Sequence, residues 1–390
     1  MSPSAITVSL GAAAIGMMLL SAPRRASAQE HEVELDSLGQ EVQLDEALGQ
    51  NLEQFSVTGF GVGLFDYRHG VDQNTLGATK LAVALYKRAG PHLSFFGQLT
   101  TAFEIPGLGG EDDEGDGEVA PETEIDNLIV SFTPPGAPEL TLWLGRFDAP
   151  LGFERDDEPL NFQPTPSFNF EFARPVKFTG LLAQYTPLPE LSMAGFVVNG
   201  WDQPLDENKG KTIGARVSVL PFEYTGISFT GVYGPEQPDD THDKRLFLGS
   251  DFTAQPIREL IVGGELNYGR EDDAAIGDGD GKWVGGLVTG FLRFAPNLGL
   301  TLRYDIFDDR DGARTGAPRT LQSFTVAPML FFRSAVTGIF STIPQTGFRI
   351  PEFTLRAGIR RDRSTDPFFE TETGLSRWET RLVVEGVYVY

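Results

Sequence analysis

The last twelve residues of the chain, 379–390, read ETRLVVEGVYVY and include two tyrosines two positions apart. One set of alternate positions carries Thr380, Leu382, Val384, Gly386, Tyr388 and Tyr390, and the other carries Glu379, Arg381, Val383, Glu385, Val387 and Val389. Successive side chains of a β-strand point to opposite faces, so this period of two indicates a strand with one apolar face. Termini of soluble domains are usually loose and polar, whereas this strand continues to the last residue.

The same alternation continues from Ser56 onward and is clear over 212–220 and 352–360. It predicts about sixteen strands, within a range of about fourteen to eighteen, because 139–149 and 283–295 alternate poorly. The expected strands are 56–68, 79–88, 92–104, 123–134, 139–149, 177–187, 190–202, 211–221, 225–235, 244–255, 258–270, 282–295, 298–309, 319–332, 348–364 and 378–390.

The connections between the expected strands are of two kinds. Those after even-numbered strands are short and rich in proline, such as AGP (89–91) and PLP (187–189), although 333–347 is long. Those after odd-numbered strands are long and acidic, such as 107–122 and 270–281. One tight rim and one rim of long loops are typical of an outer-membrane barrel, with short periplasmic turns and longer extracellular loops.

We therefore expect an all-β fold, a transmembrane antiparallel up-and-down β-barrel over residues 56–390. A soluble β-sandwich would show similar alternation, because it also hides one face of each strand. Strands of ~12 residues at ~3.3 Å per residue and ~40° tilt cover roughly 30 Å, enough for the apolar band of a membrane. A lipid-facing sheet must also close on itself, since an open edge leaves unpaired N–H and C=O groups in hydrocarbon.

An export signal precedes the expected barrel. Residues 5–20, AITVSLGAAAIGMMLL, form an uncharged run that is short for a membrane span, and Ala26-Ser27-Ala28 supplies a cleavage pattern. We expect residues 1–28 to be a cleavable signal peptide, with a transmembrane anchor as the alternative, and residues 29–55 to be an acidic periplasmic segment. No later segment has the ~18 consecutive apolar residues of a membrane helix. The predicted location is the bacterial outer membrane.

Composition narrows the function. The 390 residues include 45 glycines and 30 phenylalanines, which suits a β-rich fold with many turns. The absence of cysteine excludes disulfides, metal–thiolate sites and a cysteine nucleophile. A formal net charge of −24 argues against nucleic acid as a partner, because that partner needs clustered Lys and Arg.

Four stretches carry a family resemblance. They are WLGRFDAPLGF (143–153), FARPVKFTGLLAQY (172–185), NGWD (199–202) and YGPE (233–236). In combination they resemble the OmpL-like family of β-barrel porins, convincingly over residues 143–237. Phosphate-selective porins share the first motif, but this chain lacks a Lys-rich run for anions. The resemblance implies a channel-forming outer-membrane barrel and names no solute.

The resemblance and the strand count direct attention to the connection 149–177. It is the third external loop if the first strand starts at the periplasmic side, and by analogy with general porins we expect it to fold into the lumen and narrow it. Its charged residues are the candidates for a pore constriction: Glu154, Arg155, Asp156, Asp157, Glu158, Glu171, Arg174 and Lys177.

Periodicity also predicts which charged side chains face the lumen. The candidates on the lumen wall are Arg216, Glu265, Arg303, Asp305, Arg356, Arg360, Arg381 and Glu385. An acidic loop opposite a basic wall would set a field across a wet constriction and tune ion preference. The alternative for each residue is an ordinary solvated charge in a lumen or loop.

The resulting functional prediction is a porin, a water-filled channel for passive diffusion of small polar solutes or ions. A structural or adhesive barrel without a pore is the main alternative, and an outer-membrane hydrolase is the third. Catalysis is not expected, because the chain has four histidines and no G-x-S-x-G signature. The acidic runs 277–282 and 308–312 contain only a fragment of a calcium loop, so neither a metal nor a cofactor is expected.

The terminal strand is expected to close the barrel against the first strand. Tyr388 and Tyr390 would then form part of an aromatic girdle that contacts outer-membrane lipid and lipopolysaccharide. A terminal aromatic residue also resembles the signal read by the outer-membrane assembly machinery, although that signal more often ends in Phe. A homo-trimer is left open.

Removing the two terminal tyrosines tests the assembly signal. We expect deletion of residues 388–390 to lower sharply the amount of folded, heat-modifiable barrel, because the machinery would lose its recognition element. Normal assembly of the truncated chain would reject the signal, although the closing strand could survive.

Overall fold

The computed structural model describes residues 55–71, 73–103, 121–336, 340–343 and 345–390. The predicted signal peptide and all but the last residue of the predicted acidic segment 29–55 lie outside these residues. Within the described part of the chain, no helix has the length and apolar character needed to cross a membrane.

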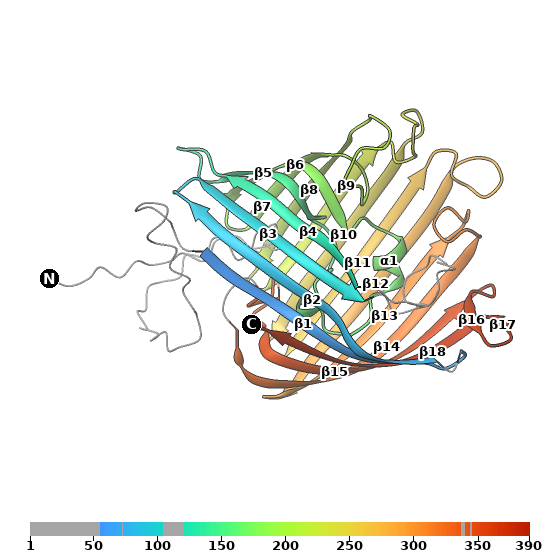
Figure 1. Cartoon of the computed structure of the whole chain (residues 1–390). Coiled ribbons are helices and arrows are strands. Elements are labelled where there is room, and N and C mark those ends of the chain that lie inside the picture. Colours follow the sequence, from blue (N-terminus) through green and yellow to red (C-terminus); the bar gives the residue numbers. More distant parts are fainter. Residues whose placement is uncertain (1–54, 72, 104–120, 337–339, 344) are drawn as a thin grey trace.

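Sixteen of the described strands close into one antiparallel barrel, which confirms the predicted architecture and strand number (Figure 1). These strands are β1 (Phe55–Arg68), β2 (Gln73–Ala89), β3 (Leu93–Phe103), β4 (Pro121–Phe132), β5 (Leu140–Asp148), β6 (Lys177–Leu188), β7 (Leu191–Val198), β8 (Thr212–Phe222), β9 (Thr225–Gly234), β10 (Arg245–Ile257), β11 (Leu260–Glu271), β12 (Gly281–Ala295), β13 (Leu298–Asp309), β14 (Arg319–Ala335), β15 (Pro351–Ser364) and β18 (Trp378–Val389). The other elements in the described part of the chain are a small hairpin of β16 (Phe369–Thr371) and β17 (Gly374–Ser376), the helix α1 (Phe168–Phe172) and a 3-10 helix (Glu158–Leu160).

The first and last strands form the seam of the barrel, as predicted from residues 379–390. β1 and β18 pair from Phe60 opposite Val389 to Arg68 opposite Arg381. Beyond that ladder, the backbones of Gly59 and Tyr390 exchange two hydrogen bonds of 3.1 and 3.0 Å. No barrel strand therefore has a free edge, which is the condition for a sheet surrounded by lipid.

The two faces of β18 follow the sequence alternation. Val383, Val387 and Val389 point inward and are buried, whereas Tyr388 and Tyr390 are each 45% exposed on the outer face. The two tyrosine rings stack with centroids 6.4 Å apart. The other barrel strands likewise expose leucine, isoleucine, valine and phenylalanine on their outer face, which suits contact with hydrocarbon.

Two strand boundaries differ clearly from the sequence expectation. β2 begins at Gln73 instead of 79, because residues 73–78 pair with β1 after a register shift at Val62/Gly63. Residues 73–78 do not alternate in hydrophobicity, so the period of two did not predict this part of the strand. β7 ends at Val198 instead of 202, which assigns the NGWD motif to a loop.

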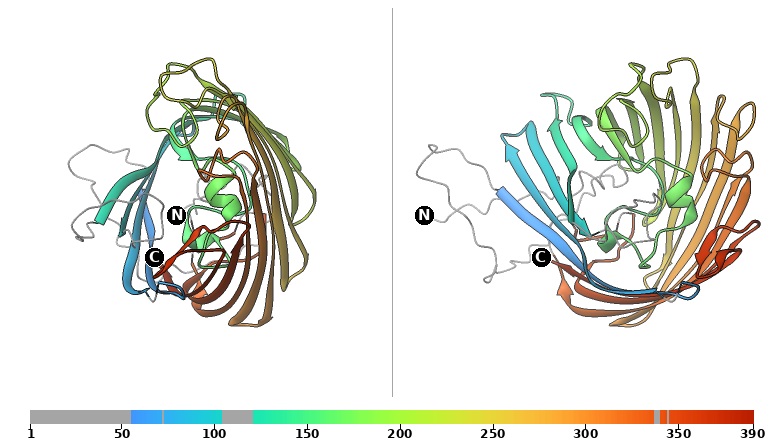
Figure 2. Two further views of the ribbon diagram at one scale, coloured as in Figure 1. Left: turned by 90° about the vertical axis from the view of Figure 1, so that its right-hand side faces the viewer. Right: turned by 45° about the vertical axis from the view of Figure 1, so that its right-hand side comes forward.

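Two long connections turn into the barrel instead of outward. One is residues 149–176, called L3 here, which carries the 3-10 helix and α1 between β5 and β6. Figure 2 shows α1 inside the ring of strands. The other joins β14 and β15 at the short-turn rim, and its described residues 340–343 and 345–350 are called the rim hairpin.

Candidate functional site

L3 crosses the interior of the barrel. On one side, Gln98 of β3 donates a 2.8 Å hydrogen bond to Asp157. On the other, the backbone N–H of Glu154 donates a 2.9 Å hydrogen bond to Glu265 of β11. β3 and β11 stand eight positions apart in either direction round the sixteen-strand barrel, so L3 contacts opposite walls.

Glu154 links separate parts of L3 to one another and to the wall. Its carboxylate accepts 2.7 and 2.6 Å hydrogen bonds from Gln163 and from the Arg303 guanidinium, and two more from the backbone and hydroxyl of Ser167. Arg303 also donates to the Thr165 carbonyl oxygen at 2.5 Å. Glu154 is 2% exposed and Arg303 is 1% exposed, so each buried charge depends on the other and on these hydrogen bonds.

Two further wall arginines hold L3 through its carbonyl oxygens. Arg356 of β15 pairs with Glu385 and donates to the carbonyl oxygen of Asn161 at 2.7 Å. Arg360 pairs with Asp362 and donates to the carbonyl oxygen of Pro166 at 2.5 Å. Buried backbone acceptors need a donor, and here the wall supplies it.

The eight predicted wall residues are all buried among protein groups, and their role beside a constriction stays a prediction. Arg216, for example, forms a bidentate pair with Asp251 at 2.6 and 2.9 Å, and Arg381 donates to Asp66 at 2.7 Å. The buried wall residues are Arg216, Glu265, Arg303, Asp305, Arg356, Arg360, Arg381 and Glu385.

The loop candidates divide into two groups. Glu154, Asp157, Arg174 and Lys177 are buried, whereas Arg155, Asp156 and Glu158 are partly exposed and Glu171 is exposed. The Arg174 guanidinium, for example, donates to two carbonyl oxygens of L3 itself. Only the second group has contact with solvent in the lumen.

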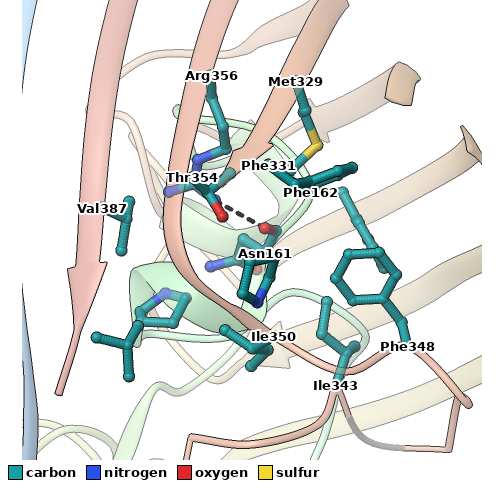
Figure 3. A pocket seen from close by; sticks show the side chains of 13 residues that line it. Asn161, Phe162, Met329, Phe331, Ile343, Phe348, Ile350, Thr354, Arg356 and Val387 are labelled. Atoms are coloured by element: carbon teal, nitrogen blue, oxygen red, sulfur yellow. Dashed lines mark hydrogen bonds between the residues drawn. The ribbon is translucent and has the colours of Figure 1, made fainter. Parts of the chain in front are cut away.

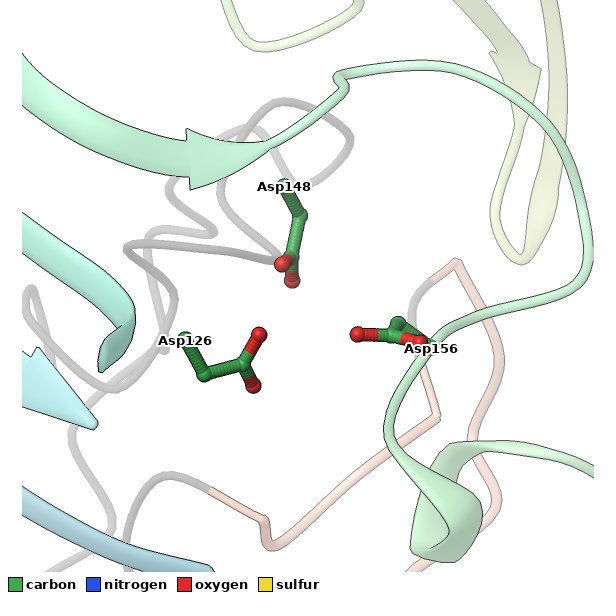
Figure 4. Close-up of side chains that lie close together, drawn as sticks. All are labelled: Asp126, Asp148 and Asp156. Atoms are coloured by element: carbon green, nitrogen blue, oxygen red, sulfur yellow. The ribbon is translucent and has the colours of Figure 1, made fainter. Parts of the chain in front are cut away.

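An acidic cluster joins L3 to β4, β5 and β6. Figure 4 shows the carboxylates of Asp126, Asp148 and Asp156 pointing toward a common centre, with oxygens within 4.8 Å of one another. The Lys177 ammonium pairs with all three, at 2.5 Å to Asp148 and 3.0 Å to Asp156. Lys177 therefore supplies the positive charge that a bound cation would otherwise bring.

Two neighbouring acids of L3 differ in their proton affinity. Burial raises the pKa of Asp156, but the ammonium groups of Lys177 and Lys80 outweigh burial and hold that pKa below its ordinary value. Burial and the nearby carboxylates, above all Asp148, raise the pKa of Asp157 well above its ordinary value. Asp156 thus carries its charge at neutral pH, while Asp157 takes up a proton more readily than a free aspartate.

The loop motifs at residues 199–202 and 233–236 meet in space. Glu236 accepts hydrogen bonds from the Trp201 backbone at 2.6 Å and from the Thr212 hydroxyl at 2.5 Å. Asp202 accepts from the backbone of Val176 and Lys177, both at 2.7 Å, at the base of L3. The motifs therefore fix the loop after β7 against L3.

The sequence matches one family along most of its length. The model of the family described as "Putative beta-barrel porin-2, OmpL-like" matches residues 98–389. The chain belongs to this OmpL-like porin family. A search of curated proteins finds no match to this chain.

Solved porins share the fold of this OmpL-like chain. OmpF of Salmonella typhi, solved in complex with daunomycin, aligns with a TM-score of 0.60 at 11% identity over 87% of this chain and 98% of its own. An anion-selective porin from Comamonas acidovorans gives 0.56 at 10% identity over 86% and 99%. The trimer form of in-vitro folded OmpT of Vibrio cholerae gives 0.55 at 10% identity over 87% and 100%. Identities this low show the common barrel fold alone.

Two acids in the long connections between strands bond to neighbouring protein groups. Asp280 pairs with Arg270 at 2.7 Å, and Asp311 accepts from the backbone N–H of Lys282 at 3.0 Å. The described histidines, His69, His92 and His242, are exposed in connections between strands, and His31 lies outside the described residues.

Proposed function

We propose that this protein is an outer-membrane channel through which small polar solutes or ions diffuse past L3. The observation that carries the proposal is a charged loop fixed across the interior of a closed sixteen-strand barrel. A loop of this kind reduces the free cross-section and sets the charge that a passing solute meets. Membership of a porin family supports the same conclusion.

The solvent-exposed charges of L3 favour cations. Asp156, Glu158 and Glu171 are the acidic residues of L3 that have contact with solvent, against Arg155 alone among its basic residues. Lys177 and Lys80 pair with Asp156 and Glu158, as the wall arginines pair with their buried partners, so the excess of acids over bases on the exposed part of L3 gives the constriction its sign. We therefore infer a preference for cations over anions.

The proposed orientation places the short-turn rim in the periplasm and the long connections outside, with a signal peptide at 1–28 for export. Outer-membrane lipid and lipopolysaccharide would then surround the apolar outer face, after insertion by the assembly machinery. OmpT was solved in a trimer form, and a homo-trimer is proposed here on that likeness alone.

Neutralising the acidic edge of L3 tests the constriction. The triple change Asp156→Asn, Asp157→Asn and Glu158→Gln should lower cation preference, because it removes the acids Asp156 and Glu158 where the loop meets solvent, together with the buried Asp157 between them. The reversal potential across a planar bilayer under a salt gradient measures the effect. An unchanged potential would reject a role for these residues in selectivity.

A matched triple change controls for total charge. Asp239→Asn, Asp240→Asn and Asp243→Asn also removes acids, but these lie in the connection between β9 and β10. We expect this variant to keep the reversal potential of the unmodified protein, since exposed charges are screened within about 10 Å at 0.1 M salt.

Conductance of the purified, refolded protein tests the proposal as a whole. Discrete open-channel steps are expected. A bilayer that stays sealed with correctly folded protein, including a variant that lacks the rim hairpin, would overturn the channel and favour the structural or adhesive barrel.

A further inference from the structure

The rim hairpin is a small unit of structure on its own. It belongs to the fifteen-residue connection 336–350, whereas the other turns on this rim have two to seven residues. The Ile350 N–H donates to the Ser341 carbonyl oxygen at 2.9 Å, and the Ile343 N–H donates to the Phe348 carbonyl oxygen at 3.1 Å. A bridge between Thr342 and Arg349 lies between these two bonds. The described residues therefore have a defined shape.

The rim hairpin reaches opposite walls of the barrel. The Phe340 ring meets Phe60 of β1 edge-on, with centroids 5.2 Å apart. At the other end, the Gly347 N–H donates a 2.7 Å hydrogen bond to Gln255 of β10, and Gln345 lies against Gly226 of β9. β1 and β9 are eight strands apart in both directions round the barrel. A segment that contacts both crosses the lumen.

Gln345 adopts a backbone conformation that is unusual for its type. Its φ is 58°, in the left-handed region that favours glycine. A β-carbon on Gly226 would lie 2.6 Å from the Gln345 side-chain oxygen, so the glycine at that wall position lets this amide approach the backbone closely. The shape of the hairpin and the shape of the wall therefore match at this contact.

The rim hairpin also meets L3 in the middle of the barrel. Phe162 of L3 stacks on Phe291 of β12 with centroids 4.5 Å apart. Phe348 of the hairpin packs edge-on against both, at 5.5 and 5.3 Å, and lies 5.5 Å from Phe331 of β14. Figure 3 shows the small pocket between the two segments, with Phe348 and Ile343 on one side and Asn161 and Phe162 on the other.

The cluster of phenylalanine rings between L3 and the rim hairpin is apolar, whereas the charged side chains described above make much of the barrel interior polar. Apolar constrictions block water and ions by dewetting, even where a small gap remains. Since L3 enters from the long-loop rim and the hairpin from the short-turn rim, the two together occupy the lumen from both ends.

We propose that the rim hairpin is a periplasmic plug that closes the lumen beneath L3, and that solutes pass when it leaves its seat on Phe60, Gly226 and Phe162. The proposal rests on the channel function proposed above. It adds a second element of control, at the opposite end from L3.

A reversible cross-link tests the plug. The chain has no cysteine, so Gly226→Cys with Gln345→Cys introduces the only two thiols. Oxidation should join the hairpin to β9 and hold the channel closed, and reduction of the same protein should restore the open-channel steps. Each single-cysteine variant, treated with the same oxidant, is the control and should conduct alike before and after oxidation.

A deletion supplies the complementary measurement. Replacing residues 338–348 by a short Gly-Ser turn should raise the conductance about threefold or more, because the apolar barrier is gone. Heat-modifiable mobility confirms that the deleted variant is folded before it is recorded.

The possible results distinguish a failure of the plug proposal from a failure of the channel proposal. Equal conductance in the oxidised, reduced and deleted proteins would overturn the plug and leave the channel intact. Failure of the two cysteines to cross-link in folded protein, both by direct oxidation and with a reducible dithiol-reactive reagent about as long as the removed Gln345 side chain, would also overturn it, because the hairpin would then not reach β9. If the deleted variant seals the bilayer as fully as the unmodified protein, the channel function itself fails, whereas an efficient cross-link would still place the hairpin across the barrel.

Discussion

A Gly59→Val variant is expected to lose nearly all folded barrel, while Gly61→Val folds as well as the unmodified protein. Both glycines lie on the outer face of β1, two residues apart. A β-carbon on Gly59 would overlap the carbonyl oxygen of Ala82 and the Tyr390 ring, which lies over this glycine. At Gly61 the nearest atom would be 4.0 Å away, on the Leu81 side chain, so valine has room there.

The physical reason is that closure needs the terminal strand close to β1. Tyr390 exchanges two backbone hydrogen bonds with Gly59, and its hydroxyl donates to the Ala82 carbonyl oxygen at 3.3 Å. Any side chain at 59 separates β1 from its neighbours and leaves edge groups unpaired in the apolar layer, which costs several kcal/mol per group. The heat-modifiable fraction after refolding into detergent measures closure.

A milder change at Tyr390 distinguishes the contribution of its ring to closure from that of its hydroxyl. Tyr390→Phe keeps the ring over Gly59 and removes one hydrogen bond, so closure should be reduced only slightly, by about 1 kcal/mol. If Gly59→Val refolded as well as Gly61→Val, the seam would not depend on this close approach.

The sequence predicted the face of each wall residue well, because the side-chain period of a strand is two. Arg303 and Arg356 point inward as expected, and the strand pairing follows the chain order. The alternation along a strand does not tell which residue of another segment will contact each inward side chain. Arg303 and Glu154 are 149 positions apart in the chain, so their 2.6 Å contact depends on the path of L3.

The same limit explains the residues that were missed. Lys80 and Gln98 contact the acidic side of L3 from β2 and β3, yet neither stands out in its strand. Asp126 is the extra residue at a register shift between β3 and β4, where Gln98 lies opposite Asn127 and Leu99 opposite Ile125, and this breaks the alternation there. A local irregularity of this kind has no signal in a pattern based on regular strands.

The rim hairpin did leave a signal. The connection 333–347 was already anomalous in length, and Phe340, Ile343, Phe348 and Ile350 make its surroundings unusually apolar for a turn in water. Four buried apolar side chains need a core, and the barrel interior is the nearest one. Composition could therefore have indicated an inward fold, although not its contacts with β1 and β9.

The second large effect is expected at the attachment of L3. Glu154→Ala removes four hydrogen bonds and leaves the buried Arg303 guanidinium with only the more distant carboxylate of Asp305, 3.4 Å away. Breaking a buried pair from one side costs about 3–5 kcal/mol, more than a loop segment can absorb in place. We expect the centre of L3 to detach, with a larger single-channel conductance and a loss of ion selectivity.

A double-mutant cycle identifies the cause. If the penalty comes from the guanidinium that has lost Glu154, Glu154→Gln with Arg303→Gln should restore much of the conductance and selectivity that Glu154→Ala loses, because both charges of the pair are removed together and Asp305 keeps its hydrogen bond from the Phe168 backbone. Glu124→Ala is the matched control, since its side chain is 56% exposed and its ion pair with Arg146 spans 3.6 Å. Exposed pairs contribute at most about 1 kcal/mol, so this variant should conduct like the unmodified protein. Should Glu154→Ala conduct and select like Glu124→Ala, L3 would be held by its other contacts, and the Arg303 pair would not position it.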